Sequence, residues 1–171
     1  KYNMILNASY NKEREEYLLY SKEYYITKPA YFYSLNSYPQ GLKIKSINEL
    51  KNYKVLGIFG YNYTMYGMDN EEVDRSAKTF MNAMKKLSLQ HSDVFLESYE
   101  IVMGELNINN TSLEELNIGY GYFEDMDIVP FYALFSKNEL GYKLKEIWDE
   151  GIIELQKTGE YYELLKKYNI N

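Results

Sequence analysis

The sequence contains no cysteine, one histidine and three prolines among its 171 residues. The lack of cysteine excludes disulfides, zinc–thiolate sites, iron–sulfur clusters and a cysteine nucleophile. A histidine-rich metal centre is also excluded, and a serine–histidine catalytic arrangement could use only His91. We therefore expect neither a metal nor a cofactor.

Arginine is scarce as well. The chain has only Arg14 and Arg75, and lysine supplies 17 of the 19 basic residues. A general bias toward lysine, asparagine and tyrosine explains most of this pattern. A guanidinium, however, grips a carboxylate through two hydrogen bonds, which lysine cannot reproduce. Both arginine positions therefore merit closer inspection, while the net charge of −6 argues against a nucleic-acid partner.

The overall composition is that of a water-soluble globular protein, with 46% hydrophobic and 26% charged residues. A length of 171 residues suits one domain or two small lobes. No segment resembles a signal peptide or a membrane-spanning helix, because the apolar runs are short and interrupted. The chain opens with Lys1 directly into a strand-like segment, so we expect a processed or truncated chain.

Strand-like and helix-like segments alternate along the chain. Strands are predicted at residues 3–8, 24–35, 54–59, 93–96 and 127–135. The spacing of apolar residues and helix-start signals predicts helices at residues 46–52, 73–87, 140–155 and 160–168. This alternation predicts an α/β fold with a largely parallel sheet.

Arg75 falls within the predicted helix 73–87, next to Asp74 and close to Glu71 and Glu72. Acidic and basic residues at such spacings pair on exposed helix faces. We therefore interpret this stretch as a solvated, charged helix face with no part in ligand recognition.

Five segments carry a resemblance to a known family. They are NASYNKER at 7–14, YSKEYY at 20–25, INELKNYKVLGIFGY at 47–61, MKKLSLQHSDVFLES at 84–98 and LKEIWDEGIIELQKTGEYYELLKKY at 144–168. Each is weak alone, but five in order along nearly the whole chain are specific. By this pattern the chain resembles the bacterial extracellular solute-binding proteins of family 3, the polar amino-acid receptors of ABC importers.

The resemblance implies a two-lobe periplasmic-binding-protein type II fold, in which each lobe is a mostly parallel sheet flanked by helices. Lobe one would comprise residues 1–28 and 130–171 and lack its N-terminal part, and lobe two would comprise residues 29–129. Two extended crossings, near residues 24–28 and 128–132, would join the lobes. A hinge motion would close the lobes on a ligand.

In lobe one the resemblance implies three ligand-binding residues. Arg14 would bind the α-carboxylate of the ligand, Ser9 would support it through its hydroxyl and N–H groups, and the carbonyl of Asn7 would accept the ligand amine. An arginine in the first turn of a helix also adds charge beside exposed backbone donors, which suits an anion site. The alternative for Arg14 is a surface ion pair with Glu13 or Glu16.

In lobe two, backbone N–H groups of Gly60 and Tyr61 could reach a carboxylate at the end of a strand. The acidic residue that contacts the amine in the family falls at Ser98 here, directly after Glu97. Because successive side chains of a strand point to opposite faces, Glu97 cannot simply replace it. Either the backbone bends locally, or the ligand has no conventional α-amino group.

The leading hypothesis is a non-enzymatic receptor for a small carboxylate-bearing solute of the amino-acid class. It would act in ABC-type import, with a membrane permease as its partner and no nucleic acid. Its place would be periplasmic or extracellular, free or tethered to the membrane.

Three alternatives stay open. The chain could be the ligand-sensing extracytoplasmic domain of a signalling receptor, or a dehydratase of the same fold that acts on prephenate-like acids. It could also be a fragment that a partner chain completes. We expect a monomer, with a swapped dimer as the alternative for a truncated chain.

Overall fold

The computed structural model describes residues 2–69 and 71–168. The chain forms two compact units, a first unit of residues 1–27 and 128–171 and a second unit of residues 28–127. The chain passes from one unit to the other after residue 27 and again after residue 127. Within the described part, no helix combines the length and apolar character that membrane spanning requires.

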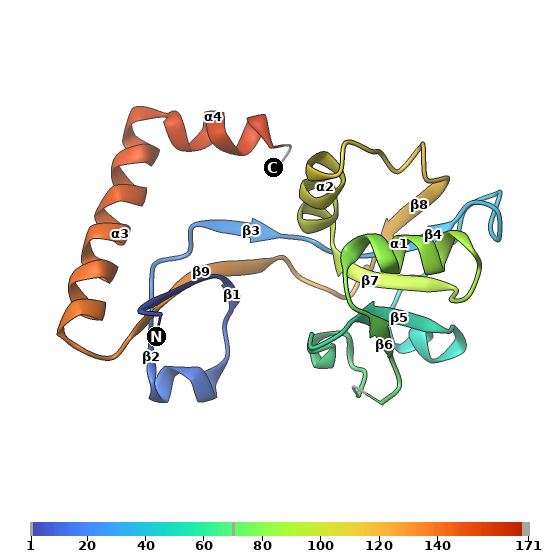
Figure 1. The fold of residues 1–171 in the computed structure, drawn as a ribbon, viewed down its shortest axis with the longest axis horizontal. Helices are drawn as coiled ribbons and strands as arrows, with labels where there is room; N and C mark the ends of the chain where they lie inside the picture. Colours follow the sequence, from blue (N-terminus) through green and yellow to red (C-terminus); the bar gives the residue numbers. More distant parts are fainter. Residues whose placement is uncertain (1, 70, 169–171) are drawn as a thin grey trace. The chain divides into compact units, whose positions relative to one another are not determined.

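The first unit is an antiparallel sheet with two helices at its C-terminal end (Figure 1). Its central strand, β9 (Val129–Ser136), pairs with β1 (Met4–Ser9), β2 (Leu18–Tyr20) and β3 (Tyr25–Thr27). A 3-10 helix (Lys12–Glu16) connects β1 to β2. Helix α3 (Glu139–Thr158) packs against β9 and β2, and α4 (Glu160–Lys167) leaves it at a sharp angle through Gly159, whose φ is +86°.

The second unit has a five-stranded sheet in the order β6-β5-β7-β4-β8. Its strands are β4 (Pro29–Ser34), β5 (Val55–Ile58), β6 (Asp74–Ala77), β7 (Val94–Ser98) and β8 (Ile118–Tyr122). Its helices are α1 (Phe80–Ser88) and α2 (Tyr99–Ile108), with 3-10 helices at Ile47–Asn52 and Thr64–Tyr66. Strand β5 runs parallel to β6 and β7, whereas β4 runs antiparallel to β7 and β8.

Each face of the second sheet buries its own apolar cluster, because successive side chains of a strand point to opposite faces. One cluster includes Phe32 and Phe95 and is covered by residues of α1 and α2. The other includes Tyr31 and Leu96 and is covered by the segments that surround the two 3-10 helices. The second unit thus has a core on both sides of its sheet.

The α/β class with helices flanking the sheets is confirmed. The predicted mostly parallel pairing is wrong for the first unit and holds for only part of the second, where β4 runs antiparallel to both of its neighbours. All pairings among the described strands of the first unit are antiparallel. Strands β1 and β2 run in the same direction, yet only residues 10–17 connect them. This connection is too short for the crossover that adjacent parallel strands usually need. Strand β9, which is distant in sequence, lies between them and runs against both.

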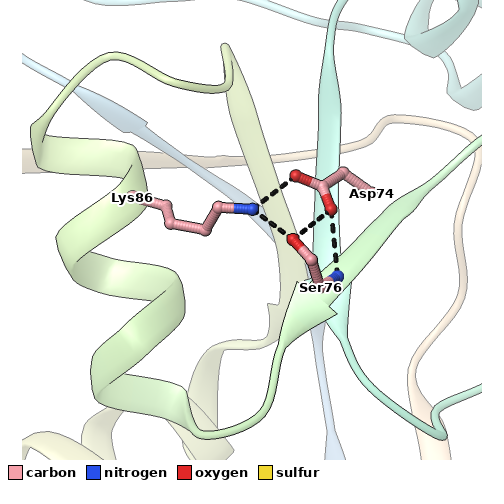
Figure 2. A network of polar contacts seen from close by, with 3 residues as sticks. All are labelled: Asp74, Ser76 and Lys86. Carbon is pink, nitrogen blue, oxygen red and sulfur yellow. Dashed lines mark hydrogen bonds and ion pairs between the residues drawn. The ribbon is translucent and has the colours of Figure 1, made fainter.

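The predicted helix 73–87 is also divided. Strand β6 precedes α1, which begins after Thr79 because the Thr79 side chain accepts a hydrogen bond from the N–H of Asn82 at 3.2 Å. The two elements are then tied together by a polar network (Figure 2). In it, Lys86 Nζ lies 2.6 Å from Asp74 Oδ2 and also donates to Ser76 Oγ.

Candidate functional site

The candidate site in the first unit is built around an irregularity in β1. Three residue steps along β1, from Ile5 to Ala8, face only two along β9, from Leu134 to Tyr132. One extra residue in one strand of an antiparallel pair defines a β-bulge, a feature enriched near functional sites. Within the bulge, Asn7 has a φ of +58°. Asparagine tolerates this left-handed conformation better than most residues.

The side chain of Tyr24 holds the bulge from the segment that precedes β3. Its hydroxyl accepts a hydrogen bond from the N–H of Asn7 at 3.1 Å and donates one to Asn7 Oδ1. Partial burial raises the pKa of Tyr24, so the phenol keeps its proton and remains a donor. The sequence suggested Asn7 as a site residue but gave no sign of its tyrosine partner.

Arg14 lies in the 3-10 helix after β1, and its side chain is half-buried. Asn11 caps this helix, since its side chain accepts hydrogen bonds from the N–H groups of Glu13 at 2.8 Å and Arg14 at 3.3 Å. No carboxylate in the described part of the chain forms an ion pair with the Arg14 guanidinium. The alternative of a surface ion pair with Glu13 or Glu16 is therefore wrong, and the guanidinium can take an external anion.

Ser9 closes β1, where it faces Phe131 of β9 and is half-buried. Asn7, Ser9 and Arg14 thus come from one short stretch, the end of β1 and the helix that follows it. This stretch offers a polar backbone irregularity, a hydroxyl and an unpaired guanidinium. Such a combination suits a small anion that also carries a hydrogen-bond donor.

In the second unit, Gly60 and Tyr61 form a turn after β5. Gly60 has a φ of +82°, which glycine adopts at no steric cost. The N–H of Tyr61 donates to the carbonyl of Ile58 at 3.2 Å, so it is already used within the turn. For the N–H of Gly60, no acceptor is found among the described residues. Only one of the two expected backbone donors is therefore available.

Arg75 supports this turn from β6. Its guanidinium is half-buried and donates from Nη1 to the carbonyl of Tyr61 at 3.2 Å. The interpretation of Arg75 as part of a solvated helix face is wrong, because residue 75 lies in a strand next to the turn. Its role is to fix the backbone of a candidate site residue.

Glu97 and Ser98 end β7 and are both buried, with exposed fractions of 9% and 5%. Glu97 faces Ala30 of β4, and its Oε1 accepts a hydrogen bond from the N–H of Ser98 at 2.9 Å. Burial raises the pKa of Glu97 to about 7; the Ser98 hydrogen bond opposes this rise and the charge of Glu105 adds to it. A carboxyl group with such a pKa in a strand-end position is typical of functional sites.

The candidate residues of the second unit gather at one edge of its sheet. Strands β5, β6 and β7 run parallel, so the turn at Gly60, the start of α1 and the Glu97–Ser98 pair all follow the carboxyl ends of strands. The negative charge of Glu97 acts on the hydroxyls of Tyr61, Tyr63 and Tyr66 and helps to raise their pKa values, after burial. Ligands of open α/β sheets bind at this edge.

Comparisons with known proteins were made at the level of sequence and of structure. No protein-family model matches the chain, and no curated protein matches it in sequence. Solved structures do match. A mutant of ArgBP from T. maritima shares 17% identity and a TM-score of 0.75, with 97% of this chain and 68% of that one covered.

Two further structures match over similar lengths. A histidine kinase sensor domain with similarity to periplasmic binding proteins has 15% identity and a TM-score of 0.76, with 97% and 69% covered. An ABC uptake transporter substrate-binding protein from Streptococcus pneumoniae with bound histidine has 16% identity and a TM-score of 0.73, with 97% and 67% covered. These matches establish the periplasmic-binding-protein type II fold for this chain.

Proposed function

We propose that this protein is a non-enzymatic receptor for a small carboxylate-bearing solute, namely an amino acid. The observation that carries the proposal is the Arg14 guanidinium, which is half-buried, lacks an ion-pair partner among the described residues and follows the bulge at Asn7. The fold adds support, because similar structures include amino-acid-binding proteins.

In the proposed mechanism, Arg14 binds the solute carboxylate through two parallel hydrogen bonds. Ser9 adds a hydroxyl donor to the same group, and the carbonyl of Asn7 accepts the amine. The second unit adds the N–H of Gly60 and the Glu97–Ser98 pair, on the arrangement that the sequence resemblance implies. Ser98 occupies the position of the family's amine-contacting acid, and Glu97 is the adjacent acid in the sequence.

Solute binding could serve two biological roles, import or sensing. We propose ABC-type import, with a membrane permease as partner and a periplasmic or extracellular location, because transporter-associated binding proteins are among the similar structures. A sensory role is the second candidate, since a histidine kinase sensor domain matches equally well. Co-purification with a permease would favour import, whereas a covalently attached signalling domain in the full-length protein would favour sensing.

A thermal melt tests the receptor proposal and identifies the solute. The protein is melted with each of the twenty common L-amino acids and with small di- and tricarboxylates. A ligand at 100 times its dissociation constant adds about 2.7 kcal/mol, which corresponds to a shift of roughly 5–10 °C at this size. We expect one chemical class to give such a shift. A flat panel would contradict the proposal.

A further inference from the structure

The bulge in β1 is the strained point of the first unit. Four described residues other than glycine have a positive φ: Asn7, Gln90, Asn110 and Asn117. Of these, only Asn7 lies inside a strand, and the other three occupy turns. A left-handed residue within a strand costs energy and persists only where its surroundings hold it. The question is therefore what holds Asn7.

The Tyr24 hydroxyl contacts Asn7 at two points, the backbone N–H and the side-chain Oδ1. A contact to the side chain alone would leave the backbone of Asn7 free to rotate, and a contact to the backbone alone would leave its side chain free. Contacts to both groups fix the backbone and the side chain together, and with them the direction of the Asn7 carbonyl. No other polar contact to Asn7 from a side chain is found in the described part of the chain.

Tyr24 is itself fixed from several sides. Its backbone carbonyl accepts a hydrogen bond from the Tyr161 hydroxyl of α4 at 2.5 Å. Its ring meets the Trp148 ring of α3 edge-on, with centroids 5.4 Å apart, and the Tyr25 ring at 4.9 Å. Both C-terminal helices therefore contribute to the placement of the hydroxyl that contacts the bulge.

We propose that Tyr24 is a positioning residue for ligand recognition, which holds Asn7 in its left-handed conformation and so fixes the carbonyl proposed to accept the solute amine. The inference rests on the proposed function, because it assigns Tyr24 a role through Asn7. Tyr24 does not itself touch the solute in this account. Its effect is to keep the Asn7 carbonyl fixed before the solute arrives, which lowers the ordering cost of binding.

The test uses the whole chain, with the twenty common L-amino acids added singly as probes in titration calorimetry. Tyr24→Phe removes the hydroxyl but keeps the ring contacts with Trp148 and Tyr25. Tyr142→Phe is the matched control, since Tyr142 is exposed on α3. We expect the affinity for the bound amino acid to fall about tenfold in Tyr24→Phe and to stay unchanged in the control.

Substitution of Asn7 separates positioning from simple stabilisation. Asn7→Gly keeps the main-chain carbonyl and adopts a positive φ freely, whereas Asn7→Ala resists it. We expect Asn7→Ala to lose more affinity than Asn7→Gly. Because Tyr24 and Asn7 act as one unit, the Tyr24→Phe/Asn7→Ala double variant should lose less than the two single losses combined.

Hydrogen exchange at the Asn7 amide gives a readout that needs no ligand. Exchange should become faster in Tyr24→Phe, because the acceptor of that N–H is removed. Unchanged exchange, or wild-type affinity in Tyr24→Phe, would overturn the inference while leaving the receptor proposal intact. If none of the probes binds the wild-type chain, the proposed function fails, and the inference fails with it.

Discussion

Glu97 places an ionisable carboxyl group inside the protein rather than in water. Its carboxyl group is buried at the end of β7, where it accepts a hydrogen bond from the N–H of Ser98. No lysine or arginine in the described part of the chain forms an ion pair with it. Buried charges without such partners are costly and tend to be neutralised by a shifted pKa. Ionised Glu97 therefore reduces the stability of the fold.

This cost predicts a specific pH dependence. The pKa of Glu97 rises from 4.5 to about 7 on folding, so the folded state keeps its proton over a range in which the unfolded state has lost it. Stability from this group is greatest below pH 4.5 and falls as the pH rises to 7. The difference between these two pKa values corresponds to a loss of roughly 3 kcal/mol of folding stability above pH 7.

Glu97→Gln removes the ionisable group, so the variant should be more stable than wild type at pH 8 and similar to it at pH 4.5. Urea unfolding at both pH values measures the difference. Glu114→Gln, which changes an exposed carboxylate, is the control and should show no such gain. An equal gain at both pH values would mean that repacking, rather than charge, is responsible.

Sequence reasoning at the residue scale found polar residues but not their conformations. Arg14 stood out because arginine is rare in this chain, and the capping box of Ser46 and Glu49 was readable from its spacing and is present in the structure. The positive φ of Asn7 could not be predicted, because it depends on the register between β1 and β9 and on a hydroxyl 17 residues away. A local sequence pattern contains neither the strand register nor the position of this hydroxyl.

At the scale of elements, α3 is joined to the sheet of the first unit by a buried polar side chain. Asp149, which is 8% exposed, accepts hydrogen bonds from the N–H of Lys22 at 2.8 Å and from Lys145 Nζ at 2.6 Å. The hydroxyl of Ser21, the residue before Lys22, accepts a hydrogen bond from the N–H of Ala133 at 2.9 Å. This short network anchors the helix to the segment between β2 and β3.

Asp149→Ala should destabilise the protein by about 1–3 kcal/mol, because the N–H of Lys22 and the ammonium group of Lys145 both lose the charged acceptor they share. Asp149→Asn keeps an acceptor oxygen and should lose less. Chemical unfolding measures the loss of stability in each variant, and hydrogen exchange shows which part of the chain is destabilised. Faster exchange confined to the second unit would contradict this assignment.

The network that ties α1 to β6 predicts a second effect at this scale. Partial burial alone would raise the pKa of Asp74, but hydrogen bonds from Lys86 and Ser76 outweigh it and lower the pKa to about 2. The stabilisation is therefore present above pH 3.8 and lost as the pH falls through 2. Because Asp74 and Lys86 are partly exposed, this ion pair stabilises the fold by only about 0.5–1 kcal/mol.

Lys86→Met should remove this stabilisation at pH 7 and make no difference near pH 2. Lys85→Met, a neighbouring exposed lysine on α1, is the matched control. Thermal melts of the three proteins at pH 7, 4 and 2 measure the effect. A loss that persists unchanged at pH 2 would show that the methylene packing of Lys86 matters, rather than its charge.

Elements were easier to predict than their partners. The strands near residues 54–59 and 93–96 and the long C-terminal helix follow from local apolar spacing, and the structure contains them. The direction of the first sheet does not follow from spacing, because β9 pairs with three strands that lie more than 100 residues earlier. The division of residues 73–87 into strand and helix depended on Thr79, whose capping signal lies inside an apparently continuous helical pattern.

At the scale of the whole molecule, the two units differ in how they are built. The second unit buries apolar clusters on both faces of its sheet. The first unit is held by antiparallel pairing to one central strand and by polar and aromatic contacts with its C-terminal helices. The candidate anion-binding group, Arg14, belongs to the first unit. On the proposed function, the carboxylate would be bound by this guanidinium, which is held on a short, capped helix.

Titration calorimetry of the wild-type chain and Arg14→Lys with the amino acid found in the melt panel tests the central claim most directly. The lysine keeps the positive charge but cannot form the two parallel hydrogen bonds, so the affinity should fall by about tenfold or more. Lys12→Ala, on the same 3-10 helix, should bind as the wild type does. Equal affinity in wild type and Arg14→Lys would contradict the account.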